Sequence, residues 1–527
     1  MVAVGCSPRV TGSEPSKPAA FDLIIRNGEV IDGTGSPRVR ADVGVRGDRV
    51  AAIGDLSQAT ATTTLDARDK VVTPGFIDLI GNSQAAVLID PKLEGKVRQG
   101  VTTEVTGEGH SPGPQNDAML AEMERTKPKG WPRVTWHTLG EFMRVVEQRG
   151  SALNFAFYVG AANPREMVLG HADRAPTAEE LQRMNAIVKQ AVDEGAVGLS
   201  SALIYPPGRF ARTEELIAMA RIGGSYWTHL RNEADRIDSA IDEAIRIGRE
   251  ANVPVNIFHL KIGGQQNWGR MPAIIKRIEA ARKSGVDIAA NIYPFTATST
   301  DLTSIVPAWA LDGGYLMLVK RLRDPATRTR IAGELRAGRL RNGGAASIVI
   351  RGNPSKRLDA IARETNADPA EAVLRLFEAN EKSPIAIFFS LSEEDMKTAL
   401  VQPWVAFGSD SGAVGEMREQ GAHPRAYATF SRVLAKYVRE EKLLTLEEAV
   451  RKMTSLPAAR AGLRDRGILR SGMKADIAVF DPRKVQDRST YEDPHHFSEG
   501  VTHVVVNGKP VLRDGKMTGA LPGRVLR

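Results

Sequence analysis

Four residues that could bind a metal ion or carry a proton each follow a short apolar segment of the sequence. They are Glu108, His229, His259 and Asp410. Imidazole and carboxylate groups suit Zn²⁺, Fe²⁺ and Mn²⁺. Three such ligands leave a coordination position for a water, and a nearby carboxylate can move that water's proton to a leaving amine. These residue types therefore predict metal-assisted hydrolysis, provided that the fold brings them together.

Each of the four residues also has a purely structural interpretation. A single histidine at the end of a strand is more often a hydrogen-bonded residue of the core or rim than a metal ligand. Glu108 could form a salt bridge, and Asp410 could cap a following turn. Their occurrence after separate apolar segments favours the metal site only if those segments are parallel strands that end at one edge.

The middle of the sequence alternates short apolar segments with amphipathic ones, as a parallel α/β fold requires. Apolar residues at helical spacing predict helices at 178–194, 234–251 and 271–284. The candidate strands are 71–78, 101–107, 154–161, 195–201, 225–229, 253–259, 286–293 and 403–409. This alternation predicts an α/β fold, a TIM-like (β/α)8 barrel. Active sites of such barrels lie at the carboxyl ends of the strands, where the four residues would meet.

The two ends of the sequence share a different texture, with short strands and tight turns. We expect turns at Asn27-Gly28, at Arg46-Gly47-Asp48 and at Asn507-Gly508. We expect residues 21–72 and 468–527 to pair into one small β-sandwich domain. The barrel then comprises residues 73–467, with an insertion at about 310–400 that carries helices at 358–363 and 369–380 and an apolar run at 384–390.

Composition is that of a soluble globular protein. The chain has 527 residues, of which 42% are hydrophobic and 25% charged, and no run is long and apolar enough for a transmembrane helix. The net charge of +8 is small for this length. An arginine-rich segment comprises Arg321, Arg323, Arg328, Arg330, Arg336, Arg339 and Arg341. Such a segment could bind nucleic acid. It lacks interleaved aromatic residues for base stacking, which favours the interpretation as solvated helical faces. We expect no nucleic-acid partner, and the oligomeric state stays open.

The single cysteine, Cys6, excludes an intrachain disulfide and a cysteine-based zinc site. It stands in Val-Gly-Cys-Ser ahead of a stretch at 7–20 rich in Ser, Pro, Thr and Gly, which resembles the end of a bacterial lipoprotein signal. The part before Cys6 is short and lacks a basic start. Two interpretations remain: a periplasmic or lipid-anchored protein with a lipidated Cys6, or a cytoplasmic protein whose residues 1–20 form a flexible tail.

Several longer stretches resemble the amidohydrolase superfamily and, within it, the D-aminoacylase (N-acyl-D-amino-acid deacylase) family. The similar stretches run nearly from end to end and include Asp22–Gly35, Thr73–Asp78 (TPGFID), Gly100–Thr103, Ser201–Gly208 (SALIYPPG), Thr228–Glu233 (THLRNE), His259–Lys261 (HLK), Gly408–Asp410, His423–Arg425 (HPR) and Lys474–Pro482. The resemblance implies a metal-dependent barrel hydrolase of amide bonds.

By this resemblance, His229 and His259 match the two metal ligands on the fifth and sixth strands, and Asp410 matches the catalytic aspartate. Lys261, Arg231 and Tyr205 match positions that line the substrate pocket, where basic groups can receive a carboxylate. Tyr293, in Ile292-Tyr293-Pro294, is expected to line it as well.

Two departures from the family pattern change the expected metal site. The family's His-x-His pair is replaced by Ile80 and Asn82, and its metal-bridging cysteine by Glu108. Some N-acetylglucosamine-6-phosphate deacetylases of the superfamily also lack this pair and hold one metal with a glutamate and two histidines. We therefore predict one zinc ion, or another divalent transition metal, on Glu108, His229 and His259, with Asp410 as general acid and base. Asn82 and His110 are expected near the pocket.

The leading hypothesis is a metal-dependent hydrolase that cleaves a C–N amide bond other than a peptide bond. Its substrate would be an N-acyl-D-amino acid or a small peptide-like amide that carries a carboxylate. The sequence leaves open a dipeptide, cyclic-amide, lactam or ester hydrolase. The loss of the His-x-His pair also leaves open a non-catalytic binding protein on the same fold.

Overall fold

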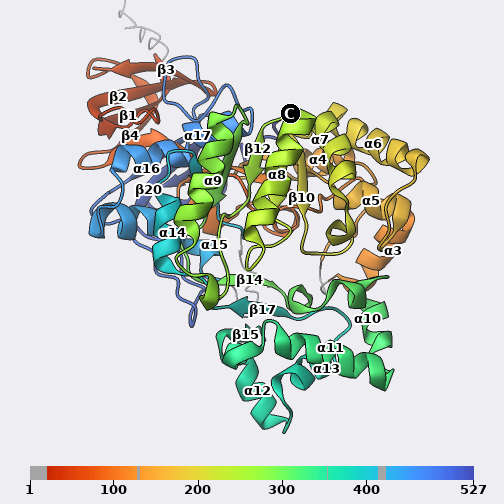
Figure 1. The fold of residues 1–527 in the computed structure, drawn as a ribbon. Coiled ribbons are helices and arrows are strands. Elements are labelled where there is room, and N and C mark those ends of the chain that lie inside the picture. The colour runs from red at the N-terminus through yellow and green to blue at the C-terminus, as the bar shows by residue number, and fades with distance from the viewer. Residues whose placement is uncertain (1–19, 128–130, 353, 413–422) are drawn as a thin grey trace, which may run out of the picture.

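A computed structural model describes residues 20–127, 131–352, 354–412 and 423–527. Figure 1 shows a β-rich unit at one end, a barrel in the middle and an inserted unit beyond the other end of the barrel. None of the described helices is long and apolar enough to cross a bilayer. Cys6 and the predicted flexible tail lie outside the described residues, except Ala20, so the lipid-anchor interpretation stays a prediction.

The barrel is built from parallel strands that follow the chain around a ring. They are β6 (Phe76–Asp78), β7 (Val101–Thr106), β8 (Asn154–Phe157), β9 (Val159–Gly160), β10 (Leu199–Ala202), β11 (Tyr226–His229), β12 (Val255–Ile257), β13 (Ile288–Ile292) and β18 (Val405–Phe407). β8 and β9 are one strand interrupted at Tyr158, whose N–H donates to Thr106 (2.9 Å). Beyond the strand ends, the N–H of Asp410 donates to the carbonyl of Ile80 (2.8 Å), which joins the last strand to the first. The predicted barrel is confirmed.

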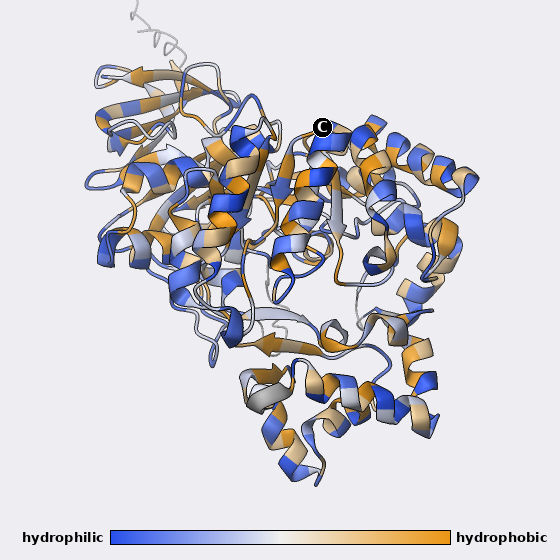
Figure 2. Ribbon diagram, viewed as in Figure 1, coloured by the Kyte–Doolittle hydropathy of each residue, from blue (hydrophilic) through white to orange (hydrophobic). Residues whose placement is uncertain are grey.

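Apolar residues fill the barrel and cover its outside. Inside, Ile77, Val105, Trp227 and Phe258 belong to one buried cluster. Figure 2 shows helices that are hydrophobic on one side and hydrophilic on the other. The outer helices are α4 (Leu139–Arg149), α5 (Ala162–Leu169), α6 (Ala178–Asp193), α7 (Thr213–Gly223), α8 (Ile237–Ala251), α9 (Met271–Lys283), α14 (Glu393–Leu400), α15 (Arg425–Arg432) and α16 (Leu446–Met453).

The spacing of buried residues shows why these helices form. α8 buries residues three and four positions apart, such as Ile237, Ala240, Ile241 and Ala244, which gives it one apolar face. α6 begins at a capping box, in which Thr177 and Glu180 satisfy each other's backbone N–H groups.

Both ends of the chain contribute to one nine-stranded sheet. Its strands are β1 (Phe21–Val30), β2 (Val39–Arg46), β3 (Arg49–Gly54), β4 (Ala61–Asp66), β5 (Val71–Pro74), β19 (Ile477–Phe480), β20 (Val501–Val506), β21 (Lys509–Arg513) and β22 (Lys516–Met517). β5 pairs antiparallel with β19, and this pairing joins the two ends. The hairpin at Asn507-Gly508 lies between β20 and β21 as predicted. The turn predicted at Asn27-Gly28 is wrong, because β1 continues through it with a register shift that the positive φ of Asn27 (65°) accommodates.

The inserted unit has its own sheet and its own buried core. Its strands are β14 (Thr298–Asp301), β15 (Ile348–Ile350), β16 (Lys356–Arg357) and β17 (Ile385–Phe388), and its helices are α10 (Tyr315–Arg321), α11 (Pro325–Ala337), α12 (Leu358–Glu364) and α13 (Pro369–Glu378). Because β14 pairs with β17, the unit begins before the predicted boundary at 310. In Figure 1, β14 and β17 lie on the side of the unit that faces the barrel.

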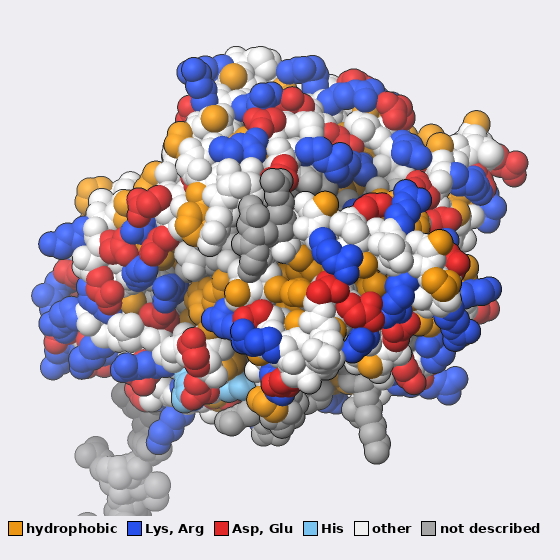
Figure 3. Space-filling view, turned by 60° about the horizontal axis from the view of Figure 1, so that its bottom comes forward, with side chains coloured by type: hydrophobic (Ala, Val, Ile, Leu, Met, Phe, Trp, Pro, Cys, Tyr) orange, Lys and Arg blue, Asp and Glu red, His pale blue; other side chains and the backbone are white. Residues whose placement is uncertain are grey.

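Most of the arginines of the arginine-rich segment pair with acidic side chains of the same unit. Arg328 contacts Glu371 and Glu378 (both 2.7 Å), and Arg336 contacts Asp368 (2.8 Å). Figure 3 shows Lys and Arg interspersed with Asp and Glu over this face of the molecule. This supports the interpretation of the segment as solvated helical faces.

A buried lysine connects the first and last strands of the barrel. Lys96, on α2 (Glu94–Val97), places Nζ 2.7 Å from Asp78 Oδ2, 2.6 Å from Ser409 Oγ and 2.7 Å from the carbonyl of Ser411. Glu104 lies 3.7 Å away, and both carboxylate side chains are fully buried. Burial, only partly offset by Lys96, raises the pKa of Glu104 to about 7.

We expect Lys96→Met to destabilise the fold strongly. The substitution leaves the buried carboxylate of Asp78 without a cation, which costs about 3–5 kcal/mol. Urea unfolding should show this loss. The control is Lys189→Met, which removes an exposed pair with Asp193 and should change stability by less than about 0.5 kcal/mol. Equal effects of the two substitutions would contradict the role given to Lys96.

Candidate metal centre and active site

The three predicted metal ligands meet at the carboxyl ends of their strands. Glu108 follows β7, His229 ends β11 and His259 follows β12. Glu108 Oε1 lies 3.0 Å from His229 Nδ1 and 3.1 Å from His259 Nε2. One ligand atom of each residue lies within 4.8 Å of those of the other two. The structure therefore brings the trio into ligating proximity.

Backbone geometry places these side chains. Glu108 stands between Gly107 and Gly109, whose φ angles are +112° and +65°. A Cβ atom at Gly109 would lie 2.4 Å from the Cβ of Ala202, so only glycine fits there. His259 has a φ of +36°, and its N–H donates to Asn291 Oδ1 (2.7 Å).

The charge around the trio fits a bound cation. Burial acts to raise the pKa of Glu108, but contacts with His229 and His259 hold it well below its usual range. Burial and Lys261 act to lower the pKa of His259, but Asp410, Glu233 and Glu108 outweigh them and raise it to about 9. His229 Nε2 is buried, and its nearest acidic group is the Glu233 carboxylate at 3.3 Å. Two imidazoles and a carboxylate in an acidic surround suit Zn²⁺ or a related ion.

Glu233 supports both histidines, a role that sequence reasoning missed. Its carboxylate lies 3.1 Å from His259 Nδ1, 3.3 Å from His229 Nε2 and 2.8 Å from Lys261 Nζ. It therefore contacts the ring nitrogens that face away from Glu108. A carboxylate in this position orients metal-bound imidazoles and fixes their tautomer. The signal was available, because Glu233 ends the THLRNE motif four residues after His229.

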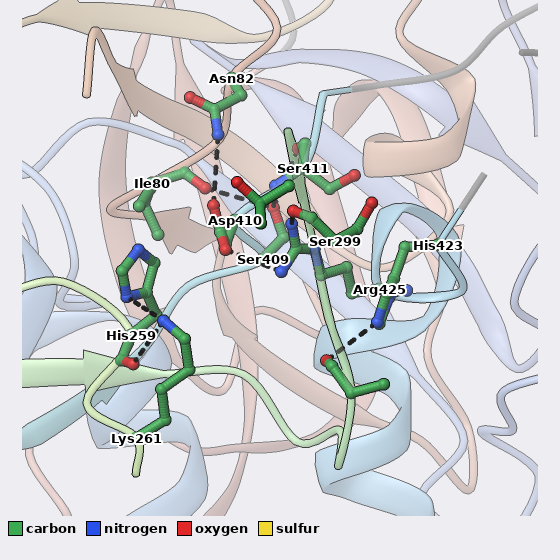
Figure 4. Close-up of polar contacts among 12 residues, drawn as sticks. Ile80, Asn82, His259, Lys261, Ser299, Ser409, Asp410, Ser411, His423 and Arg425 are labelled. Atoms are coloured by element: carbon green, nitrogen blue, oxygen red, sulfur yellow. Dashed lines mark hydrogen bonds and ion pairs between the residues drawn. The ribbon is translucent and has the colours of Figure 1, made fainter. Parts of the chain in front are cut away.

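Asp410 lies at the end of β18 with an uncommon backbone conformation, φ +49°. Its Oδ2 is 2.7 Å from Arg425 Nη1, and its Oδ1 accepts a long hydrogen bond from Asn82 Nδ2 (3.4 Å). Figure 4 shows both side chains approaching the carboxylate. Ile80 is 1% exposed and packs in the apolar interior. In the described part of the chain, the other group of potential metal ligands, Glu122, Glu166 and His171, shares no residue with the trio.

Arg425 is the second functional candidate that sequence reasoning missed. It begins α15 and is buried, with its guanidinium 4.8 Å above the Tyr293 ring and Nη2 donating to the carbonyl of Ser299 (3.3 Å). Its Nη1 forms the ion pair with Asp410, whereas its Nε makes no hydrogen bond. The HPR motif contained the residue, but Arg425 stands at the start of a helix and not at the end of a strand, which hid its role.

His423, two residues earlier, helps to fix Arg425. Burial and the neighbouring Arg425 hold the pKa of His423 well below its usual range, so its ring is neutral. The ring contacts the carbonyl of Ala297 through Nε2 (3.1 Å), and its Nδ1 accepts from the N–H of Arg425 (3.1 Å).

The other predicted pocket residues take different positions. Tyr205 places its hydroxyl against Thr300 and its ring 5.8 Å from that of His229. Lys261 donates to Glu233 (2.8 Å), and its Nζ lies 2.7 Å from His259 Nδ1. Arg231 makes two contacts to Glu243 (2.8 and 2.9 Å) and two to backbone carbonyls. Both cations already have carboxylate partners, so their role as substrate ligands stays a prediction.

His110 lies away from this site. Its side chain is 46% exposed, and Nε2 is 3.0 Å from Glu166 on α5. It lines neither of the cavities beside the metal ligands. The turn after Glu108 directs it outward, so the expectation that it lies near the pocket is wrong. A second group of potential donors nearby, Glu122, Glu166 and His171, is only partly buried.

Two cavities meet at the metal ligands. One measures about 420 Å³ and is lined by Asn82, Trp131, Asp301 and Arg425, among others. The other measures about 1100 Å³ and runs between the barrel loops and the inserted unit. Glu108, Tyr205 and Asp410 line both. A substrate can therefore extend to either side of the reacting centre.

We expect the purified protein to contain about one divalent metal ion per chain, as measured by elemental mass spectrometry without chelators. Glu108→Ala should lose most of this metal on dialysis, because it removes the only carboxylate of the trio. His110→Ala, two residues away, should retain it. About two ions per chain in the unmodified protein would show that the ligand set is incomplete.

Comparisons with known proteins agree with this geometry. Residues 63–512 match the amidohydrolase family. The chain is 37% identical to a D-aminoacylase and 36% identical to an N-acyl-D-glutamate deacylase, both of Alcaligenes xylosoxydans xylosoxydans, over 96% of its length and 97% and 96% of theirs. A crystal structure of N-acyl-D-glutamate deacylase from Bordetella bronchiseptica, complexed with zinc and a phosphonate inhibitor, aligns with a TM-score of 0.81 and 34% identity over 96% of this chain and 99% of that one. This chain belongs to the amidohydrolase family.

Proposed function

We propose that this protein is a metal-dependent deacylase of N-acyl-D-amino acids. The observation that carries the proposal is the meeting of the Glu108, His229 and His259 trio with Asp410 and Arg425 at two cavities that share Glu108 and Asp410. The relatives named above are deacylases of this type, and the Bordetella structure contains zinc. A protein that only binds would have no need to hold these groups together, so the arrangement favours catalysis over the non-catalytic alternative.

When bound, a divalent metal at the trio supplies a water of lowered pKa and polarises the scissile carbonyl. Asp410 is the base that takes the water's proton and then delivers it to the leaving nitrogen. Asn82 and Arg425 hold the Asp410 carboxylate from two sides. Glu233 keeps both imidazole rings oriented toward Glu108.

Arg425 is the best-placed receptor for the substrate carboxylate. It lines the cavity beside Asp410, which engages its Nη1, while its buried Nε has no hydrogen-bond acceptor. A planar guanidinium can bind a carboxylate through two parallel hydrogen bonds. Lys261 and Arg231 are less suited, because each nitrogen of these side chains already contacts an acceptor or His259, whereas Arg425 keeps its Nε free.

Asp410→Asn should lower kcat for an N-acetyl-D-amino acid by about 10²–10⁴-fold. The amide keeps the size of the carboxylate but cannot accept the proton. Initial rates over a panel of N-acetyl-D- and N-acetyl-L-amino acids would measure this, with metal content determined in parallel. The exposed Asp193→Asn should have no effect. Unchanged activity of the Asp410 variant would overturn the mechanism, and no turnover of any panel member by the metal-loaded protein would overturn the substrate class.

Arg425→Met should reduce kcat/KM for N-acetyl-D-leucine more than for N-acetyl-D-leucinamide, which lacks the carboxylate. The preference for the acid should fall by about 10- to 100-fold, the range expected for losing a hydrogen bond between charged groups. An equal loss on both substrates would show that Arg425 acts only by holding Asp410.

A further inference from the structure

One acidic side chain in the smaller cavity has no hydrogen-bond or ion-pair partner among the described residues. Asp301 ends β14 and lines the cavity of about 420 Å³ together with Tyr205, Asp410 and Arg425. Among the described residues, no hydrogen bond or ion pair involves its carboxylate, unlike those of Glu108, Glu233 and Asp410. Neither the metal site nor the proposed mechanism uses it.

β14 fixes the position of Asp301 relative to the active site. The carbonyl of Ser299 accepts from Arg425, and the hydroxyl of Thr300 contacts that of Tyr205. Asp301 is the next residue along and pairs across the sheet with Ile385, which lines the same cavity. The inserted unit thus contributes an acidic group to the wall of the substrate cavity, whereas the metal ligands come from the barrel.

The surroundings of Asp301 leave its charge uncompensated. Burial raises its pKa to about 6, and Lys382, the one cation that opposes this shift, forms no ion pair with it. Arg425, on the same cavity, is engaged by Asp410 (2.7 Å). A buried charge is costly unless a counter-charge reaches it. None of the described residues supplies such a counter-charge to Asp301. A cationic group of the substrate is its natural source.

We propose that Asp301 binds an ammonium group of the substrate, so that preferred substrates are amides with a carboxylate for Arg425 and a primary amine for Asp301. This rests on the proposed deacylase function and narrows its substrate class. The apolar side chains of Ala85, Ile89 and Leu93 line the same cavity and suit the methylene groups that separate the amine from the amide. The amine can belong to the acyl half, as in a dipeptide, or to the side chain of a basic D-amino acid.

Two matched pairs of substrates test the proposal and distinguish these sources. In the first pair, glycyl-D-leucine is compared with propionyl-D-leucine, in which a methyl group replaces the ammonium. In the second, N-acetyl-D-lysine is compared with N-acetyl-D-2-aminoheptanoate, which has the same replacement on the other half. We expect kcat/KM to favour the ammonium member of one pair by at least about tenfold, as for a hydrogen bond between charged groups. The pair that shows the preference identifies the half that carries the amine.

The variant Asp301→Asn removes the charge and keeps the shape. It should abolish the preference for the ammonium substrate while leaving kcat/KM for its methyl counterpart within about twofold. Glu381→Gln, which removes an exposed charge from the same unit, should change neither. The comparison of substrates on unmodified protein needs no variant and decides the question if Asp301→Asn folds poorly.

Hydrolysis of the methyl substrates as fast as the ammonium substrates, in both pairs, would overturn the ammonium site and leave the deacylase function standing. A preference that persists in Asp301→Asn would also overturn the role of this residue. No hydrolysis of any of the four substrates by the metal-loaded protein would overturn the deacylase function and this inference with it.

Discussion

The ammonium of Lys96 is the interaction on which the geometry of the active site depends. It contacts Ser409 and Ser411, the residues on either side of Asp410, and it contacts Asp78 at the end of the first strand. Asp410 is thereby held between two anchored neighbours, in a backbone conformation that few residues adopt freely. The cost of burying this cation is offset by Asp78 and by aligned oxygen acceptors. The same ion pair that closes the barrel therefore aims its reactive carboxylate.

Charge complementarity extends from this closure to the metal ligands. Glu108 and Glu233 contact opposite sides of the two imidazoles, and Lys261 is held against the outer carboxylate. Ile80 occupies an apolar position, and Asn82 turns its amide toward Asp410. The two side chains that stand in place of histidines therefore have structural roles: Ile80 packs in the apolar interior, and Asn82 holds Asp410. A single metal on the trio is consistent with all of these contacts.

The sequence was sufficient to predict the residues whose positions follow from strand polarity. Glu108, His229, His259 and Asp410 each stand at the carboxyl end of a parallel strand, and such ends meet wherever a barrel closes. Glu233, Arg425 and Asp301 were missed because they reach the site from a loop, a helix start and an inserted strand. His110 was misplaced because a glycine-rich turn separates it from Glu108. Asn27-Gly28 has the residues typical of a turn but lies in a β-bulge, because β1 pairs with β2 on both sides of it.

The cavity walls come from two parts of the protein with separate apolar cores. The barrel supplies the metal ligands and Asp410, whereas β14 and β17 of the inserted unit supply residues such as Asp301 and Ile385. Substitutions in the unit can therefore be absorbed by its own core without disturbing the strand ends that hold the metal. Substitutions in β14 and β17 could therefore change the substrate while the metal ligands and Asp410 stay the same. A protein engineer could use the same separation to alter specificity.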